Sequence, residues 1–271
     1  MNISGSVGYT LLKLKSKNKY VLLFADIHDD VNYCKQDSVM IDTWLDNKDN
    51  NDILLEEAVR EKLSLTELWP GSLHTKKLQE LNRNNHKIKP IDVRPLLIPF
   101  SWELSEINKE LSKMSLKEYI SKLEDLFNLK KTKFMLNYIY PEVKKLGDSI
   151  FKVSLLTHFN ELKELFEEFK EEYKKYMEKT ILYLFRNNPV VLERINNLTS
   201  LIMEWYILVL IHNSDINTII HVGLAHSNRL LDLLSQVYRF EVLKESGINR
   251  MSERHSHNAC IKMPENISDI F

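Results

Sequence analysis

Short apolar runs alternate with polar segments in the first hundred residues and again after residue 213. Runs of this length, rich in leucine and β-branched residues, are typical of buried strands in a parallel sheet. The predicted strands are residues 9–14, 20–25, 53–57, 87–93, 217–222 and 240–243. One helix is predicted from residue 29 to about 45 and another from 227 to 238. A further helical stretch follows the strand at 53–57 and ends at about residue 84. The pattern therefore predicts an α/β fold with a mainly parallel sheet and flanking helices.

Between residues 101 and 213 the apolar positions recur in steps of three and four residues, which predicts helices only. One long stripe consists of Leu155, Leu156, Phe159, Leu162, Phe166, Phe169, Tyr173 and Tyr176. Such a stripe is typical of a helical core or of a surface that binds another helix, including a helix of a second copy in a homo-oligomer. We therefore expect a large all-helical insertion or subdomain that can serve as a lid.

This pattern divides the chain into four parts. Residues 1–100 form the first part of the α/β core, 101–213 the helical insertion and 214–245 the second part of the core. Residues 246–271 are predicted to be a flexible tail because they show no periodicity. His255, His257 and Cys260 imitate a metal-binding cluster there, but we assign them to the tail. The predicted strands at 9–14 and 20–25 flank a polar turn and form a hairpin at the sheet edge.

Composition and charge narrow the classes of partner. Lys and Arg number 37 against 38 Asp and Glu, so nothing indicates binding to nucleic acid or to an anionic membrane. The apolar stretch at 201–211 is shorter than the roughly 20 residues that span a bilayer, and we expect a core helix there. The N-terminus lacks the signature of a signal peptide. Two cysteines, Cys34 and Cys260, exclude a scaffold with many disulfides and fit a reducing compartment, so we expect an intracellular protein.

The first candidate site residues follow the predicted strand at 20–25. Asp26 and His28 are two residues apart, so both side chains can reach one ion or one substrate from an extended segment. A carboxylate with an imidazole is a common ligand set for Zn, Mn or Fe. The alternative is structural, with Asp26 capping the next helix and His28 on the surface.

Two glutamates, Glu56 and Glu57, directly follow another apolar run. Adjacent strand residues point to opposite faces, so we expect only one of them to face the shared site. That carboxylate is either a metal ligand or a general base with a pKa raised by burial.

A histidine also follows the predicted strand at 217–222. His226 comes three residues after Gly223, which permits a tight turn before a helix whose first backbone N–H groups are free. A histidine at this position can act as a base, a metal ligand or an oxyanion donor. His221, within the strand, is predicted to face the other way. The carboxyl ends of parallel strands meet at one edge, so we expect Asp26 and His226 to line one site there.

Three further charged residues are weaker candidates. Asp92 and Arg94 lie on one face of a predicted strand end, where the pair is structural or the guanidinium orients a carboxylate or an anionic substrate. Glu204 interrupts an apolar helix, and an unpaired buried carboxylate is costly. Arg194 can be its partner only if the helix is broken; otherwise Glu204 projects into the site.

The motifs Ala25-Asp-Ile-His28, Glu56-Glu57 and Gly223-Leu-Ala-His226 resemble those of the TraB/TIKI superfamily, which includes erythromycin-esterase-like and haem-binding ChaN-like proteins. Together with Ile91-Asp-Val-Arg94 they also resemble uncharacterised proteins of large DNA viruses. The resemblance covers mainly residues 20–95 and 217–240. It implies a hydrolase fold centred on His28, Glu56 or Glu57, and His226, with a divalent metal in the TIKI-like branch and metal-free hydrolysis in the esterase-like branch.

These observations favour a metal-assisted hydrolase that acts on an ester, amide or peptide bond of a small molecule or peptide. Asp26, His28, Glu57 and His226 are the expected metal ligands, and Glu56, Glu57, His226 and Arg94 the expected catalytic residues. A metallophosphoesterase is less favoured, because the segment around Asp26 resembles its first motif but the later motifs are absent. The other alternative is a non-catalytic viral structural or host-interaction protein, in the virion or host cytoplasm, on a degenerate enzyme fold.

Overall fold

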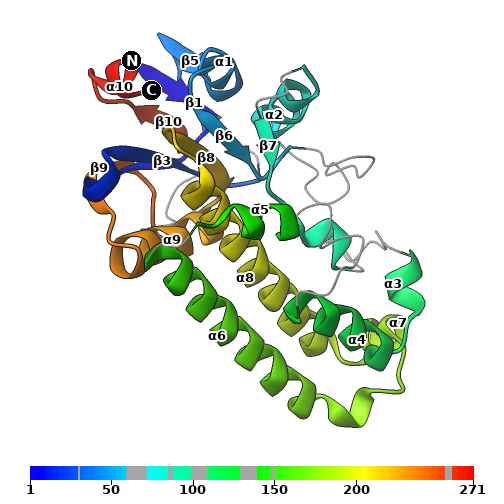
Figure 1. Cartoon of the computed structure of the whole chain (residues 1–271). Helices are drawn as coiled ribbons and strands as arrows, with labels where there is room; N and C mark the ends of the chain where they lie inside the picture. Colours follow the sequence, from blue (N-terminus) through cyan, green and yellow to red (C-terminus); the bar gives the residue numbers. More distant parts are fainter. Residues whose placement is uncertain are drawn as a thin grey trace. The chain divides into compact units, whose positions relative to one another are not determined.

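The computed structural model in Figure 1 shows a mixed α/β protein with two mostly parallel sheets and flanking helices. It describes residues 1–29, 31–58, 72–84, 88–98, 109–128, 139–147, 150–253 and 258–271. The chain divides into two compact units. The α/β unit consists of Met1–Asp92 and Ser214–Phe271, and the helical unit of Val93–Asn213.

The main sheet of the α/β unit has six strands in the order β7-β6-β8-β3-β2-β9. Their bounds are β2 Gly8–Leu14, β3 Lys19–Asp26, β6 Asp52–Leu55, β7 Ile88–Pro90, β8 Thr218–Gly223 and β9 Glu241–Gly247. The four strands β7, β6, β8 and β3 are parallel neighbours, so their carboxyl ends lie at one edge of the sheet. The prediction of a parallel core is confirmed.

The central strands are apolar because both of their faces are covered. Leu22 and Phe24 point to a core that includes helix α1 (Ile41–Asp46), where the rings of Phe24 and Trp44 meet edge to face at 5.6 Å. Ala25 belongs to a second cluster with Leu224, the first residue of helix α9 (Leu224–Asp232). Alternate residues of β3 therefore pack on opposite layers, as the pleat of a strand requires.

The hairpin of β2 and β3 is present, but it does not form the sheet edge. A short 3-10 turn, η1 (Lys15–Lys17), and the left-handed Asn18 (φ 47°) connect its strands. Strand β9 pairs antiparallel with β2 and occupies the edge. It is longer than the predicted strand at 240–243. The predicted helix at 227–238 begins three residues earlier, as α9, and continues as the π-helical turn η6 (Leu233–Val237).

Two further predictions about the α/β unit, for residues 29–45 and for the tail, were wrong. Instead of one helix from residue 29 to 45, the structure has β4 (Asn32–Tyr33), β5 (Ser38–Met40) and the short α1. The predicted flexible tail contains β10 (Asn258–Lys262) and α10 (Ile267–Ile270). With β1 (Asn2–Ser4), these strands form a second sheet in the order β4-β10-β1-β5. The tail is held because Ala259, Ile261 and Met263 alternate and are buried, so it gains a core through pairing with a strand far away in sequence.

The two cysteines join these rearranged segments. Cys34, directly after β4, and Cys260, in β10, form a disulfide with their Cα atoms 4.8 Å apart. Their sulfur atoms are thus already bonded to each other, and Cys260 offers no thiolate to a metal cluster. His255 and His257 lie outside the described residues.

In the helical unit, the regular elements that the structure describes are helices. They are η3 Arg94–Leu96, α3 Lys109–Lys113, α4 Leu116–Phe127, α5 Tyr140–Lys145, α6 Ile150–Glu172, η5 Lys174–Tyr176, α7 Ile181–Asn187 and α8 Pro189–Asn213. An isolated bridge also joins Ser115 to Thr180. Ser115 begins α4 with a capping box, because its hydroxyl accepts from the Glu118 N–H while the Glu118 carboxylate accepts from the Ser115 N–H.

The apolar stripe is mostly part of the core of the helical unit. Phe166 of α6 stacks on Phe127 of α4, with ring centres 4.8 Å apart, and Phe159 contacts Trp205 of α8. Helix α8 is long and apolar enough to cross a membrane by length and composition, and 78% of its most apolar stretch is buried in the protein. The prediction of a core helix at 201–211 is confirmed, since every residue from 202 to 211 is buried.

Candidate functional site

Neighbouring strands bring the predicted site residues of the α/β unit together at one edge. Asp26 is the last residue of β3 and is in register with Gly223, the last residue of β8. His221 of β8 is in register with Leu55 of β6, directly before the two glutamates. The backbone N–H of Glu56 extends this pairing by donating to the His221 carbonyl at 3.0 Å.

The Asp26 carboxylate lies between two histidines. Its Oδ1 is 2.8 Å from His74 Nε2, and its Oδ2 is 3.0 Å from His28 Nδ1. Burial alone would raise the pKa of Asp26, but hydrogen bonds and positive charge from both histidines hold that pKa below its usual range. Asp26 is therefore ionised, and His28 lies close enough to form an ion pair with it.

Glu56 contacts the other two parts of the predicted site. Its Oε2 accepts a hydrogen bond from the Gly223 N–H at 2.6 Å. The same oxygen is 3.6 Å from His28 Nε2, and Oε1 is 3.6 Å from His226 Nε2. Both imidazoles approach this carboxylate from separate strand ends. The structure therefore brings His28, Glu56 and His226 together.

Glu57 also belongs to the cluster, contrary to the expectation that only one glutamate would. Its Oε1 is 2.8 Å from His221 Nδ1 and 3.8 Å from His28 Nδ1. Strand β6 ends at Leu55, so the strict alternation of an extended strand does not apply to the two residues that follow. The prediction that His221 would face away was wrong for the same reason, since Glu57 turns to meet it.

His74 is a member of the cluster that the sequence did not reveal. It lies in the first turn of α2 (Leu73–Asn84), is fully buried, and reaches Asp26 from 48 residues away in sequence. His74 does not follow an apolar run in the sequence, whereas the other predicted site residues of the α/β unit do. Only long-range packing places it here.

Burial and charge distinguish two parts of the cluster. The side chains of Asp26, Glu57 and His221 are fully buried, whereas those of His28 and His226 are 10% and 8% exposed. Burial would lower the pKa of His28, but hydrogen bonds to Asp26 and Glu56 hold it well above the ordinary value. Burial would likewise lower the pKa of His221, but the charge of Glu57 and the hydrogen bond to it raise that pKa above the ordinary value. The carboxylates therefore favour the protonated form of both imidazoles.

Three buried residues fit a divalent metal ion. Asp26, Glu57 and His221 each offer one ligand atom, and these atoms lie within 4.8 Å of one another. Glu57 Oε2 and His221 Nε2 are also buried and lack a hydrogen-bond partner among the described residues, whereas Asp26 Oδ2 lies 3.0 Å from His28 Nδ1. Two carboxylates with an imidazole suit Zn, Mn or Fe. Of the four predicted ligands, Asp26 and Glu57 belong to this triad, while His28 contacts both of them and His226 contacts Glu56.

The weaker candidates Asp92, Arg94 and Glu204 are also buried. Asp92 follows β7, and Arg94 begins η3 in the helical unit. Glu204 is buried in α8, where its charge acts on His158. Arg194 pairs with Glu172 at 2.9 Å. Arg194, which the sequence offered as a partner for Glu204, therefore forms an ion pair with Glu172 instead.

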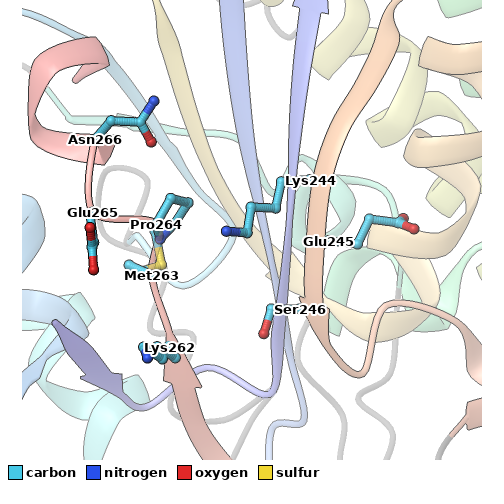
Figure 2. A pocket seen from close by; sticks show the side chains of 8 residues that line it. All are labelled: Lys244, Glu245, Ser246, Lys262, Met263, Pro264, Glu265 and Asn266. Atoms are coloured by element: carbon cyan, nitrogen blue, oxygen red, sulfur yellow. The ribbon is translucent and has the colours of Figure 1, made fainter.

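Figure 2 shows a pocket of about 600 Å³ in the α/β unit that contains none of the cluster residues. Residues of β9 and the segment that runs from β10 towards α10 line it: Lys244, Glu245, Ser246, Lys262, Met263, Pro264, Glu265 and Asn266. Its two lysines and two glutamates balance in charge, so the lining favours neither an anion nor a cation.

No protein-family model, curated protein or solved structure matches this chain. The resemblance to the TraB/TIKI superfamily therefore stays a prediction from short motifs.

Proposed function

We propose that the protein is a metal-assisted hydrolase that acts on an ester, amide or peptide bond. The observation that carries this proposal is the convergence of Asp26, Glu57 and His221 from three neighbouring parallel strands, with ligand atoms within 4.8 Å of one another. An unsatisfied buried polar atom costs about 1–3 kcal/mol. Glu57 Oε2 and His221 Nε2 are two such atoms among the described residues, and a bound cation would add a partner for the residues that carry them.

A divalent cation in this triad supplies Lewis-acid polarisation of water and of a scissile carbonyl. The side chains around it have separate roles. Glu56, fixed by the Gly223 N–H, takes a proton from the attacking water. His28 and His226 are the cluster members with exposed area, so they meet the substrate and return a proton to the leaving group. Asp92 and Arg94 stay candidates from the sequence alone, and we assign them no role at the cluster.

We also propose that residues 101–213 form a helical insertion in the α/β core, since they lie between β7 and β8 in the chain and belong to the helical unit. Most of the apolar stripe on α6 is buried within that unit. A homo-oligomer would therefore have to use another surface of the insertion.

The test begins with full-length protein stripped of metal by a chelator. Titration calorimetry with Mn²⁺, Zn²⁺ and Fe²⁺ measures binding, and p-nitrophenyl esters and a fluorogenic peptide mixture measure hydrolysis. We expect one ion per chain, and we expect Asp26→Asn and Glu57→Gln to abolish tight binding. Glu56→Gln should keep the ion and lose hydrolysis, because it removes the base and leaves the triad intact.

His158→Gln is the matched control, because it replaces a partly buried histidine of the helical unit. It should keep both the metal and the activity. Stoichiometric metal binding that survives in both triad variants would refute the assignment of the ligands, and a metal-loaded wild type inactive on every bond class would refute the hydrolase.

The alternative function is non-catalytic, with the cluster as a structural centre on a degenerate enzyme fold. Full burial of the triad favours it, because structural metal sites are closed whereas catalytic sites keep an open position. Metal removal distinguishes the two. A structural centre loses thermal stability with the ion, and Glu56→Gln then has no effect on any activity.

A further inference from the structure

We propose that His74 is a positioning residue that fixes Asp26 in the orientation needed to bind a metal ion. This inference rests on the metal centre proposed above and adds the groups that hold it in place. Its basis is a chain of contacts that runs from Tyr33 through His74 to Asp26.

The contacts of His74 define which of its ring nitrogens donates to Asp26. Its Nε2 is 2.8 Å from Asp26 Oδ1, and an ionised carboxylate only accepts, so Nε2 carries a hydrogen and donates. The Tyr33 hydroxyl lies 3.1 Å from the other ring nitrogen, Nδ1. The bond to His74 thus holds Oδ1, and Oδ2, which lies 3.0 Å from His28 Nδ1, is the oxygen that we assign to the ion.

Local structure keeps the His74 ring in this position. Ser72 precedes α2, and its hydroxyl accepts from the Thr75 N–H at 3.4 Å, which fixes the first turn of the helix. The Ser72 hydroxyl also lies 3.2 Å from His74 Nε2. On the other side, the Tyr33 ring meets the His74 ring edge to face, with centres 5.9 Å apart. The imidazole is thus held by groups from two separate segments.

A hydrogen-bonded partner behind a metal ligand typically changes metal affinity or activity 10–100-fold when it is mutated. His74→Leu removes the donor, whereas His74→Gln retains an N–H of similar reach. Tyr33→Phe keeps the His74 side chain and removes the hydroxyl that contacts both its Nδ1 and its backbone N–H. These three variants separate the role of the donor from that of the ring volume.

The probe is Co²⁺ added to full-length, chelator-treated protein, with Kd from calorimetry and the visible spectrum of the bound ion as a second readout. We expect His74→Leu to raise Kd about 10–100-fold and to alter the spectrum, and His74→Gln to restore both. Tyr33→Phe should raise Kd about fivefold. His158→Leu, in the helical unit, should change neither.

The outcomes distinguish this inference from the function on which it rests. If wild type binds no Co²⁺, the metal centre itself is refuted, and this proposal with it. If wild type binds and His74→Leu gives the same Kd and spectrum, only the role of His74 is refuted. Equal weakening in His74→Leu and His74→Gln would also refute it. If circular dichroism shows that His74→Leu is unfolded, Tyr33→Phe decides, and an unchanged Kd there overturns the proposal.

Discussion

The disulfide between Cys34 and Cys260 should contribute a large part of the stability of the α/β unit. The two residues are 226 positions apart in sequence, so the bond closes almost the whole chain into one loop. The loss of loop-closure entropy in the unfolded chain gives an upper limit of about 5 kcal/mol at 25 °C for a loop of this length. It also holds β4 against β10, two strands that pair over only two residues.

Urea unfolding followed by circular dichroism measures this contribution in the wild type and in a Cys34→Ser/Cys260→Ser variant. With a slope of about 2–3 kcal/mol per M urea, a full contribution lowers the midpoint by about 2 M. Reducing agent should shift the wild type towards the variant and leave the variant unchanged, which controls for effects of the reductant itself. A wild-type midpoint that does not respond to reduction would refute the reasoning.

Three further substitutions test the site, a buried charge and the helical core. Gly223→Ala places a Cβ 3.0 Å from His28 Nε2, so metal affinity and hydrolysis should fall with little loss of stability; Gly147→Ala, where a Cβ meets nothing within 4 Å, is the control. Burial lowers the pKa of Lys19 from 10.5 to about 8. Between pH 8 and 10.5 the unfolded state therefore binds more protons than the folded state, and the free energy of unfolding rises with pH. Urea midpoints at pH 7.5 and 9.5 should therefore show a rise, at most about 1.4 kcal/mol per pH unit, that Lys19→Met abolishes. Phe166→Ala should destabilise the fully buried stack on α4 by about 3–5 kcal/mol, measured by urea unfolding, and a loss below 1 kcal/mol would contradict the packing.

The sequence predicts the strands of the main sheet well because their signal is local. A run such as residues 20–25 is apolar at every position, as a strand covered on both faces requires. The same runs mark where the chain leaves the sheet, which is why Asp26, His28 and the two glutamates could be identified in advance. Their convergence followed from the rule that parallel strands end at one edge.

Long-range pairing explains most of the failures. Residues 29–45 contain acidic residues typical of a first helical turn, yet β4 and β5 form because β10 and β1 supply partners. In the tail, Ala259, Ile261 and Met263 alternate as in a strand, but this pattern is short and the surrounding residues are polar, so it does not stand out in the sequence. His74 had no local signal, since its role depends on where α2 begins relative to Asp26.

The energetics of the cluster argue that it is there for a ligand. Replacing buried ion pairs by apolar residues of similar volume is often neutral or stabilising, so a sheet edge lined with leucine would fold at least as well. Instead, the chain buries Asp26, Glu56 and Glu57 beside four histidines and leaves Glu57 Oε2 and His221 Nε2 without hydrogen-bond partners among the described residues. Fold stability alone does not account for that arrangement. The cation that we propose would account for it, because Asp26, Glu57 and His221 each offer one ligand atom within 4.8 Å of the others.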